Sequence, residues 1–201
     1  MICIDIENRS RYGFLSYCEQ EKAVPPLDSP FDTSLLPDLP APRGALDLKP
    51  PEKLLLWAVR TWAHTVKRHG RAGNALAVGL EPAGCLDLAE PIAEFLSISG
   101  TAAYRPLALH TPCCPCLGQD EQRLLALISA QQNGHNADLF DIAAPLIPPQ
   151  ALSRSLPAIR GAATALSANG LFLPLRAWVF LPYQVGLPMS EKQSCARGSM
   201  S

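Results

Sequence analysis

The chain has 201 residues, of which 48% are hydrophobic and 17% are charged, and its formal net charge is −1. This hydrophobic share excludes a wholly disordered chain, and the near-zero net charge excludes a globally basic nucleic-acid binder. Proline is the compositional anomaly: the count of 20 is roughly twice the usual share of ~5%, so we expect one ordinary domain joined to extended segments.

The first eighteen residues, 1–18, show a weak alternation of apolar and polar side chains, which predicts a short β-hairpin. Asp5 and Glu7 stand where a secretory signal peptide carries positive charge, and no apolar run follows them. The seven cysteines are odd in number and unevenly spaced, so a disulfide framework is not expected. We therefore expect a cytoplasmic protein with reduced thiols.

Residues 19–50 are predicted to form a Pro-rich acidic arm. The prolines exclude a helix interior or a central strand and favour an extended, locally polyproline II backbone. Seven acidic and three basic residues between Glu19 and Glu52 give this stretch a net charge of −4. Apolar side chains scattered along it would allow the arm to lie across a domain surface.

The first helix is predicted over 51–69, with Pro51 at its first position and Gly70 after its end. At 100° per residue, one stripe is apolar and is predicted to face inward; its members are Leu55, Ala58, Val59, Trp62, Ala63 and Val66. The opposite face is basic and carries a tryptophan; its members are Trp57, Arg60, His64, Lys67 and Arg68. Because Trp and Arg are enriched at interface hot spots, this face is the first candidate binding surface.

Four further helical segments are predicted between short loops rich in Gly, Pro and Asn. They run from between 87 and 91 to Ser99, from Gln119 to Gln132, from Asn136 to Ala144, and from Pro148–Pro149 to Asn169. Pro157 is expected to kink or split the last of them, with Ser155 capping its second half. No alternating strand pattern separates these segments, so residues 51–170 are predicted to form an all-α domain, an irregular bundle of about five helices.

The chain after this domain has two parts of different composition. Residues 171–189 form an apolar segment, but Arg176 and three prolines interrupt it, so it does not fit a membrane-spanning helix. Residues 190–201 are small and polar and are predicted to form a disordered tail.

The densest cluster of reactive side chains spans residues 110–116. His110, Cys113, Cys114 and Cys116 have the donor types of a structural zinc site, but they lack the usual spacing of two residues and a second pair of ligands. A reactive thiol near the start of the helix predicted over 119–132 is a competing interpretation. A third is that prolines fix a tight turn around cysteines that pack as small apolar residues.

No phosphate-binding glycine loop, nucleophile elbow or H-E-x-x-H motif occurs in the chain, so catalysis is not the preferred hypothesis. We expect a non-catalytic interaction or regulatory protein that binds a macromolecular partner, a protein rather than a nucleic acid, through the basic Trp-bearing helix face. In the regulatory version the acidic arm covers this face until a partner displaces it. The alternative without a binding role is that the basic face only forms ion pairs with acidic residues of its own chain. The other functional hypothesis is a zinc-binding or redox-sensing regulatory domain centred on His110–Cys116.

Overall fold

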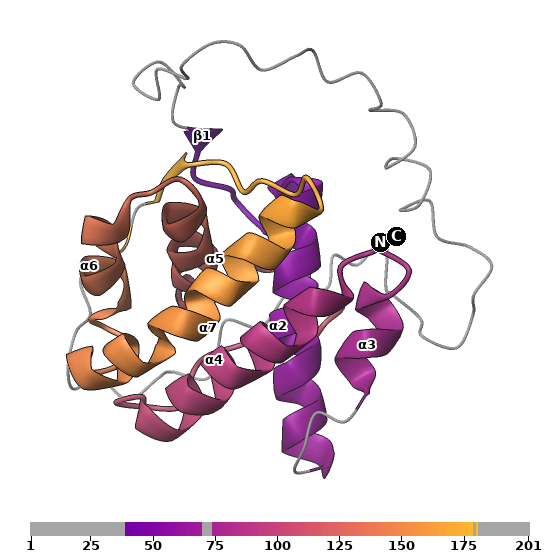
Figure 1. Ribbon diagram of the computed structural model, residues 1–201, viewed down its shortest axis with the longest axis horizontal. Helices are drawn as coiled ribbons and strands as arrows, with labels where there is room; N and C mark the ends of the chain where they lie inside the picture. Colours follow the sequence, from indigo (N-terminus) through magenta and orange to yellow (C-terminus); the bar gives the residue numbers. More distant parts are fainter. Residues whose placement is uncertain (1–38, 70–73, 179, 181–201) are drawn as a thin grey trace, which may run out of the picture.

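The computed structural model describes residues 39–69, 74–178 and 180, and this part of the chain is mostly helical (Figure 1). The helical fold class is therefore confirmed. The hairpin predicted over 1–18, most of the arm and the tail over 190–201 lie outside the described residues. The α-helices are α2 (Pro50–His69), α3 (Ala75–Leu80), α4 (Ala89–Ala102), α5 (Gln119–Gln132), α6 (Leu139–Ala143) and α7 (Pro149–Ala168).

The helix ends follow from local backbone chemistry. Helix α5 spans the predicted Gln119–Gln132, and acidic side chains in its first turn complement the positive end of the helix dipole. Gly134 and Gly170 follow α5 and α7 with φ values of +76° and +69°, a region that glycine adopts without steric cost. Short 3₁₀ turns at Leu86–Leu88 and Asn136–Asp138 lead into α4 and α6. The predicted second and fourth helices are therefore each present with a 3₁₀ turn at the start.

Of the two alternatives predicted for the last helix, a kink or a split at Pro157, the split is wrong. Helix α7 runs without interruption from Pro149 to Ala168. Proline has no N–H, so Pro157 cannot donate to the Ser153 carbonyl oxygen as another helical residue would. Both residues are exposed, so water can solvate that oxygen instead. Ser155 is buried, and its Oγ donates to the Ala151 carbonyl oxygen over 2.9 Å. Ser155 therefore donates to the preceding turn of α7 and is not the predicted N-cap of a second helix.

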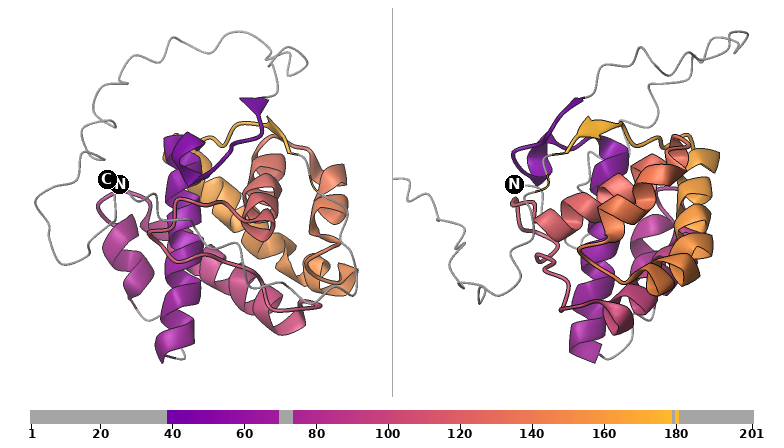
Figure 2. Two further views of the ribbon diagram at one scale, coloured as in Figure 1. Left: turned by 180° about the vertical axis from the view of Figure 1, so that it is seen from behind. Right: turned by 90° about the vertical axis from the view of Figure 1, so that its left-hand side faces the viewer.

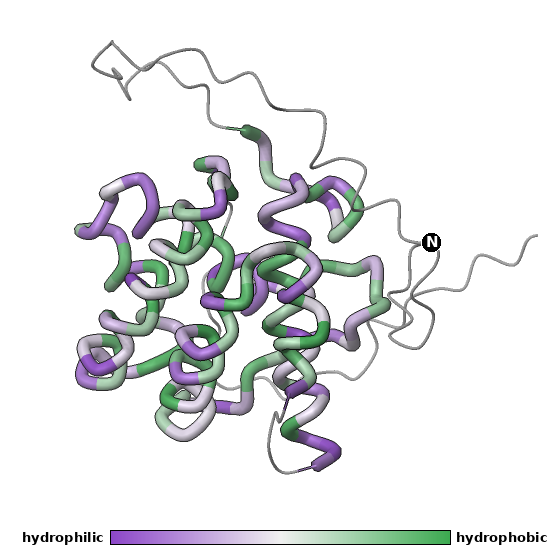
Figure 3. Tube along the Cα trace, turned by 45° about the vertical axis from the view of Figure 1, so that its right-hand side comes forward, coloured by the Kyte–Doolittle hydropathy of each residue, from purple (hydrophilic) through white to green (hydrophobic). Residues whose placement is uncertain are grey.

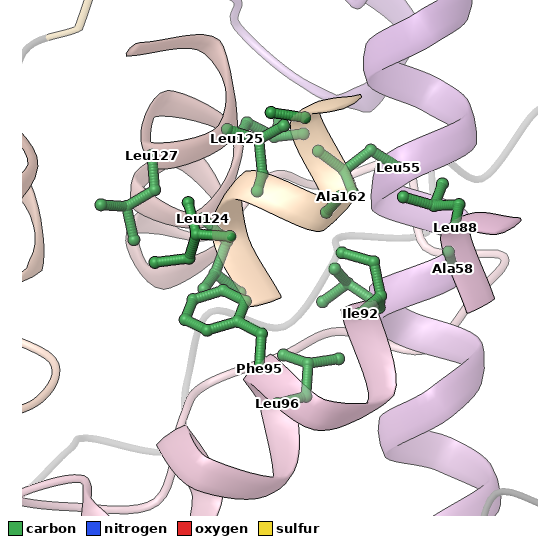
Figure 4. Packing of buried hydrophobic residues seen from close by; sticks show 14 of the residues in the cluster. Leu55, Ala58, Leu88, Ile92, Phe95, Leu96, Leu124, Leu125, Leu127 and Ala162 are labelled. Carbon is green, nitrogen blue, oxygen red and sulfur yellow. The ribbon is translucent and has the colours of Figure 1, made fainter. Parts of the chain in front are cut away.

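Helix α7 packs against both α4 and α5, and the hydrophobic core lies between these helices and α2 (Figure 4). Phe95 and Leu96 of α4, Leu125 of α5 and Ile159 of α7 are almost completely buried. Gly161 of α7 sits against the Pro91 ring, so the absence of a side chain there lets the two helices approach closely. Burial of each such large apolar side chain contributes about 1.5–3 kcal/mol. None of the described helices is long and apolar enough to cross a membrane.

The two ends of the described chain meet beside the first turn of α2 (Figure 2). Strand β1 (Leu39–Pro40) pairs in parallel with strand β2 (Arg176–Ala177), and the Leu39 N–H donates to the Leu175 carbonyl oxygen over 3.2 Å. The Arg176 guanidinium donates to both carboxylate oxygens of Glu52 over 2.6 and 2.7 Å, and to the Pro40 carbonyl oxygen over 3.0 Å. The last residues of the arm and the segment after α7 are therefore both anchored to the helical body.

Candidate interaction surface

The residues predicted to form one partner-binding face do not share a surface in the structure, and the prediction for Trp57 is wrong. Its side chain is only 7% exposed and belongs to the hydrophobic core. Helix α3, which was not among the predicted helices, packs against α2, and Gly79 of α3 lies directly on the Trp57 ring. A Cβ atom at position 79 would overlap the carbons of that ring. Trp57 therefore anchors α3 to α2 and offers nothing to a partner.

Arg60 is not on the surface either, because its side chain is 2% exposed and forms a salt bridge with Glu121. Its Nε and Nη2 donate to the two carboxylate oxygens of Glu121, each over 2.8 Å. Its Nη1 and Nη2 also donate to the carbonyl oxygens of Cys114 and Cys116, each over 2.6 Å. Arg60 thus ties α2 to the start of α5 and to the cysteine loop, residues 110–118. Four of the five N–H donors of the guanidinium are used in this way, and the side chain is buried, so Arg60 is not accessible to a partner.

Glu121 lies at the centre of this buried network, and its side chain is fully buried. Besides Arg60, its carboxylate accepts the Gly118 N–H over 2.9 Å and the His110 N–H over 2.9 Å, and it lies 3.0 Å from His110 Nδ1. The Gly118 bond is the half of a capping box in which the third helical residue reaches back to the N-cap.

The charge state of Glu121 follows from these contacts. Burial alone would raise the pKa of the carboxyl group, but the hydrogen bonds from Arg60, Gly118 and His110, with the Arg60 charge, outweigh it and hold the pKa below its ordinary value. Glu121 is therefore a carboxylate, and His110 Nδ1 carries the proton that it donates to it.

Asp120 beside it fixes the approach to the same loop. Its buried carboxylate accepts Arg105 Nη1 and Nη2 over 2.6 and 2.7 Å, and the Ala108 N–H over 2.7 Å. The two acidic residues that open α5 thus hold the chain from Arg105 to Gly118 against the helical body.

The predicted zinc ligands are not assembled into a metal site. Within 39–69, 74–178 and 180, no group of three or more His, Cys, Asp or Glu side chains is placed to hold a metal ion. His110 turns Nδ1 to Glu121, and the backbone around Cys114 and Cys116 is fixed by Arg60. Cys113 is exposed, whereas Cys114 and Cys116 are half-buried. The described geometry does not bring the predicted zinc ligands together, and the zinc and thiol roles of the loop both stay predictions.

What remains of the predicted face is His64, Lys67 and Arg68 in the last part of α2; together with His69 we call these residues the basic end. His64 is half-buried, and the other three are exposed. This end of α2 projects beyond the neighbouring helices, and its tube is strongly hydrophilic (Figures 1 and 3). Among the residues that the structure describes, neither Lys67 nor Arg68 forms a salt bridge. Cations in the last turn also suit the negative end of the helix dipole.

Two surface hollows lie elsewhere and contain none of the predicted site residues. One, of about 500 Å³, lies between the 3₁₀ turn Leu86–Leu88 and helix α7 and is lined by Asp87 and Arg160 among others. The other, of about 310 Å³, lies between α5, the region of α6 and the chain after α7, and includes His135 and Trp178. The predicted site residues therefore do not line either of these two hollows.

The burial of Trp57 and Arg60 had a signal in the sequence. From Leu54 to Val59 the helix is apolar at every position, which indicates burial all round, in place of one apolar stripe. The role of Glu121 also had one, because a Glu three residues after Gly118 has capping-box spacing. The partners that cover Arg60 had no local signal, because they lie more than fifty positions away along the chain.

Comparison of the chain with protein-family models, with curated proteins and with solved structures finds no match.

Proposed function

We propose that this is a non-catalytic interaction protein with a regulatory role, which binds an acidic surface of a partner protein through the basic end of α2. The observation that carries the proposal is the exposure of Lys67 and Arg68 on a projecting helix end, with no acidic partner among the described residues. Trp57 and Arg60 have no part in this surface, because both are buried.

The size of the basic end sets the kind of binding to expect. Exposed ion pairs contribute about 0.2–1 kcal/mol each, so two or three cations give weak association that salt weakens further. Such charges steer and orient a partner more than they hold it. The remaining affinity has to come from apolar contacts, and helix α3, which packs against α2, exposes one apolar side chain, Val78. A nucleic acid is the less favoured partner, because it requires a wider basic stripe than one helix end supplies.

The proposal is tested by removing the two charges. A fluorescein-labelled peptide of ten glutamates serves as the acidic probe, and fluorescence anisotropy gives the Kd at low salt. The Lys67→Gln/Arg68→Gln variant should bind about 2- to 30-fold more weakly than the wild type, as expected for two exposed ion pairs.

The matched control removes the same charge from another helix. Arg154 and Arg160 are exposed on α7, and neither forms a salt bridge within the described part of the chain. The Arg154→Gln/Arg160→Gln variant should keep the wild-type Kd for the peptide. An equal loss in both variants would show a response to net charge alone and would contradict the proposed surface. Tighter binding of a single-stranded oligonucleotide of equal charge would assign the surface to nucleic acid.

A further inference from the structure

The arm enters the helical body at the end of α2 opposite to the basic end. Pro40 is held by Arg176, which also binds Glu52 in the first turn of α2, and Leu39 is bonded to Leu175. The side chains of Glu52 and Arg176 are 1% and 5% exposed, so the ion pair between them is shielded from water. The residues before Leu39 are therefore tethered at a defined point of the helix.

The tether is long enough to reach the basic end. A helix of 20 residues such as α2 is about 30 Å long at a rise of about 1.5 Å per residue. In polyproline II the chain advances about 3.1 Å per residue, so roughly ten residues cover this length. Asp28, Glu21 and Glu19 lie at or beyond that separation from Leu39, whereas Asp38 is too close to the anchor.

The charge and composition of the same stretch suit the basic end. Residues 19–38, which we call the outer arm, contain five acidic residues and one basic residue, a net charge of −4. Four prolines in the outer arm restrict its φ angles, so less conformational entropy is lost when it docks. Attachment to the same chain gives an effective concentration on the order of millimolar for linkers that can span the distance.

We infer that the outer arm docks on the basic end of α2 in its own chain and competes there with an acidic partner. This inference rests on the proposed function and adds its regulation. The arm is an intramolecular mimic of the partner: its carboxylates face Lys67 and Arg68 until a stronger or more concentrated acidic surface displaces them. Because each exposed ion pair is weak, the arm lowers the affinity for the partner only in part, and this inhibition decreases with increasing salt.

The first experiment removes two carboxylates from the arm of the full chain. The Glu21→Gln/Asp28→Asn variant should bind the ten-glutamate peptide about 2- to 10-fold more tightly than the wild type, because the internal competitor is weakened. The matched control, Asp138→Asn/Asp141→Asn, removes the same charge from the exposed surface around α6. An equal gain in both variants, or no gain in the arm variant, overturns the inference.

Failure of the inference is distinguishable from failure of the proposed function. If Lys67→Gln/Arg68→Gln weakens peptide binding while Glu21→Gln/Asp28→Asn changes nothing, the surface stands and the arm is not its competitor. If Lys67→Gln/Arg68→Gln has no effect on peptide binding, the surface itself is wrong.

A second experiment tests the contact directly. A carbodiimide couples a carboxylate to a lysine amine only when the two are in contact, and mass spectrometry of the digest identifies the pair. We expect Lys67 to couple to an acidic residue of the outer arm within a monomer, and added 0.5 M NaCl should suppress the product. Coupling of Lys67 between two chains would assign the surface to self-association, and coupling only to acids of the helical body would overturn the inference.

Discussion

Arg60 and Arg68 lie on the same helix, and their surroundings give them opposite roles. Arg60 is buried and donates to Glu121 and to the carbonyl oxygens of Cys114 and Cys116. Arg68 is exposed, and within the described residues it forms no salt bridge. The position of a cation around a helix therefore does not decide its role, because the elements that cover the helix decide it.

The two arginines differ also in what their removal costs. Loss of a buried partner leaves an uncompensated charge inside the protein, and this typically costs about 3–5 kcal/mol. Substitution of an exposed side chain such as Arg68 usually changes the free energy of unfolding by no more than about 0.5 kcal/mol. Variants that act on the covered part of α2 and leave the basic end intact test this difference.

The largest effect is expected for Arg60→Met. Glu121 would keep its charge in a buried site without its guanidinium, so the free energy of unfolding should fall by about 3–5 kcal/mol. Urea denaturation followed by circular dichroism measures this change. Adding Glu121→Gln to Arg60→Met should restore part of the loss, because the uncompensated charge is then gone. A loss below 1 kcal/mol for Arg60→Met would mean that Arg60 is not enclosed as described.

A smaller effect is expected for Gly79→Ala, which tests the cover over Trp57. The new Cβ overlaps the indole ring, and overpacking of this kind typically costs about 1–3 kcal/mol. Gly100→Ala is the control, because a Cβ there meets nothing within 4 Å and the residue lies within α4. That control should stabilise the protein by about 0.5–1 kcal/mol, since alanine is the better helix former. Equal thermal midpoints for the two variants would show that α3 does not cover Trp57.

The third prediction concerns acid. The pKa of Glu121 is lowered in the folded protein, so its contribution to stability is present above its unfolded pKa of about 4.3 and is lost as the pH falls through the folded value. Between pH 7 and pH 3 the free energy of unfolding should therefore fall more in the wild type than in Glu121→Gln. Urea titrations at both pH values measure the difference. Parallel falls in the two proteins would show that the Glu121 carboxylate is not held by the network.

Local sequence signals accounted for much of the fold and for little of the site. The limits of α5 and the start of α7 follow from residues next to them, such as Asp120, Gly134 and Pro149. Helix α3 was missed because six apolar residues carry no amphipathic period, and its packing on Trp57 is a tertiary contact.

The buried network shows the same limit more clearly. Arg60, Glu121 and the cysteine loop come together from distant parts of the chain. The helical period of α2 describes where side chains point, but it carries no information about the loop that later covers them. Two candidate sites that were separate in the sequence, the helix face and the cysteine cluster, thus meet at one guanidinium.

Reversing the charge of the basic end, with binding and stability measured on the same variant, tests the proposed surface. In Lys67→Glu/Arg68→Glu the anisotropy titration with the ten-glutamate peptide should show at least about 10-fold weaker binding, while the thermal midpoint stays within about 2 °C of the wild type. Unchanged peptide affinity in a folded variant would contradict the central claim that this end of α2 recognises the partner. A large drop of the midpoint would contradict the claim that these two side chains stand outside the packed body.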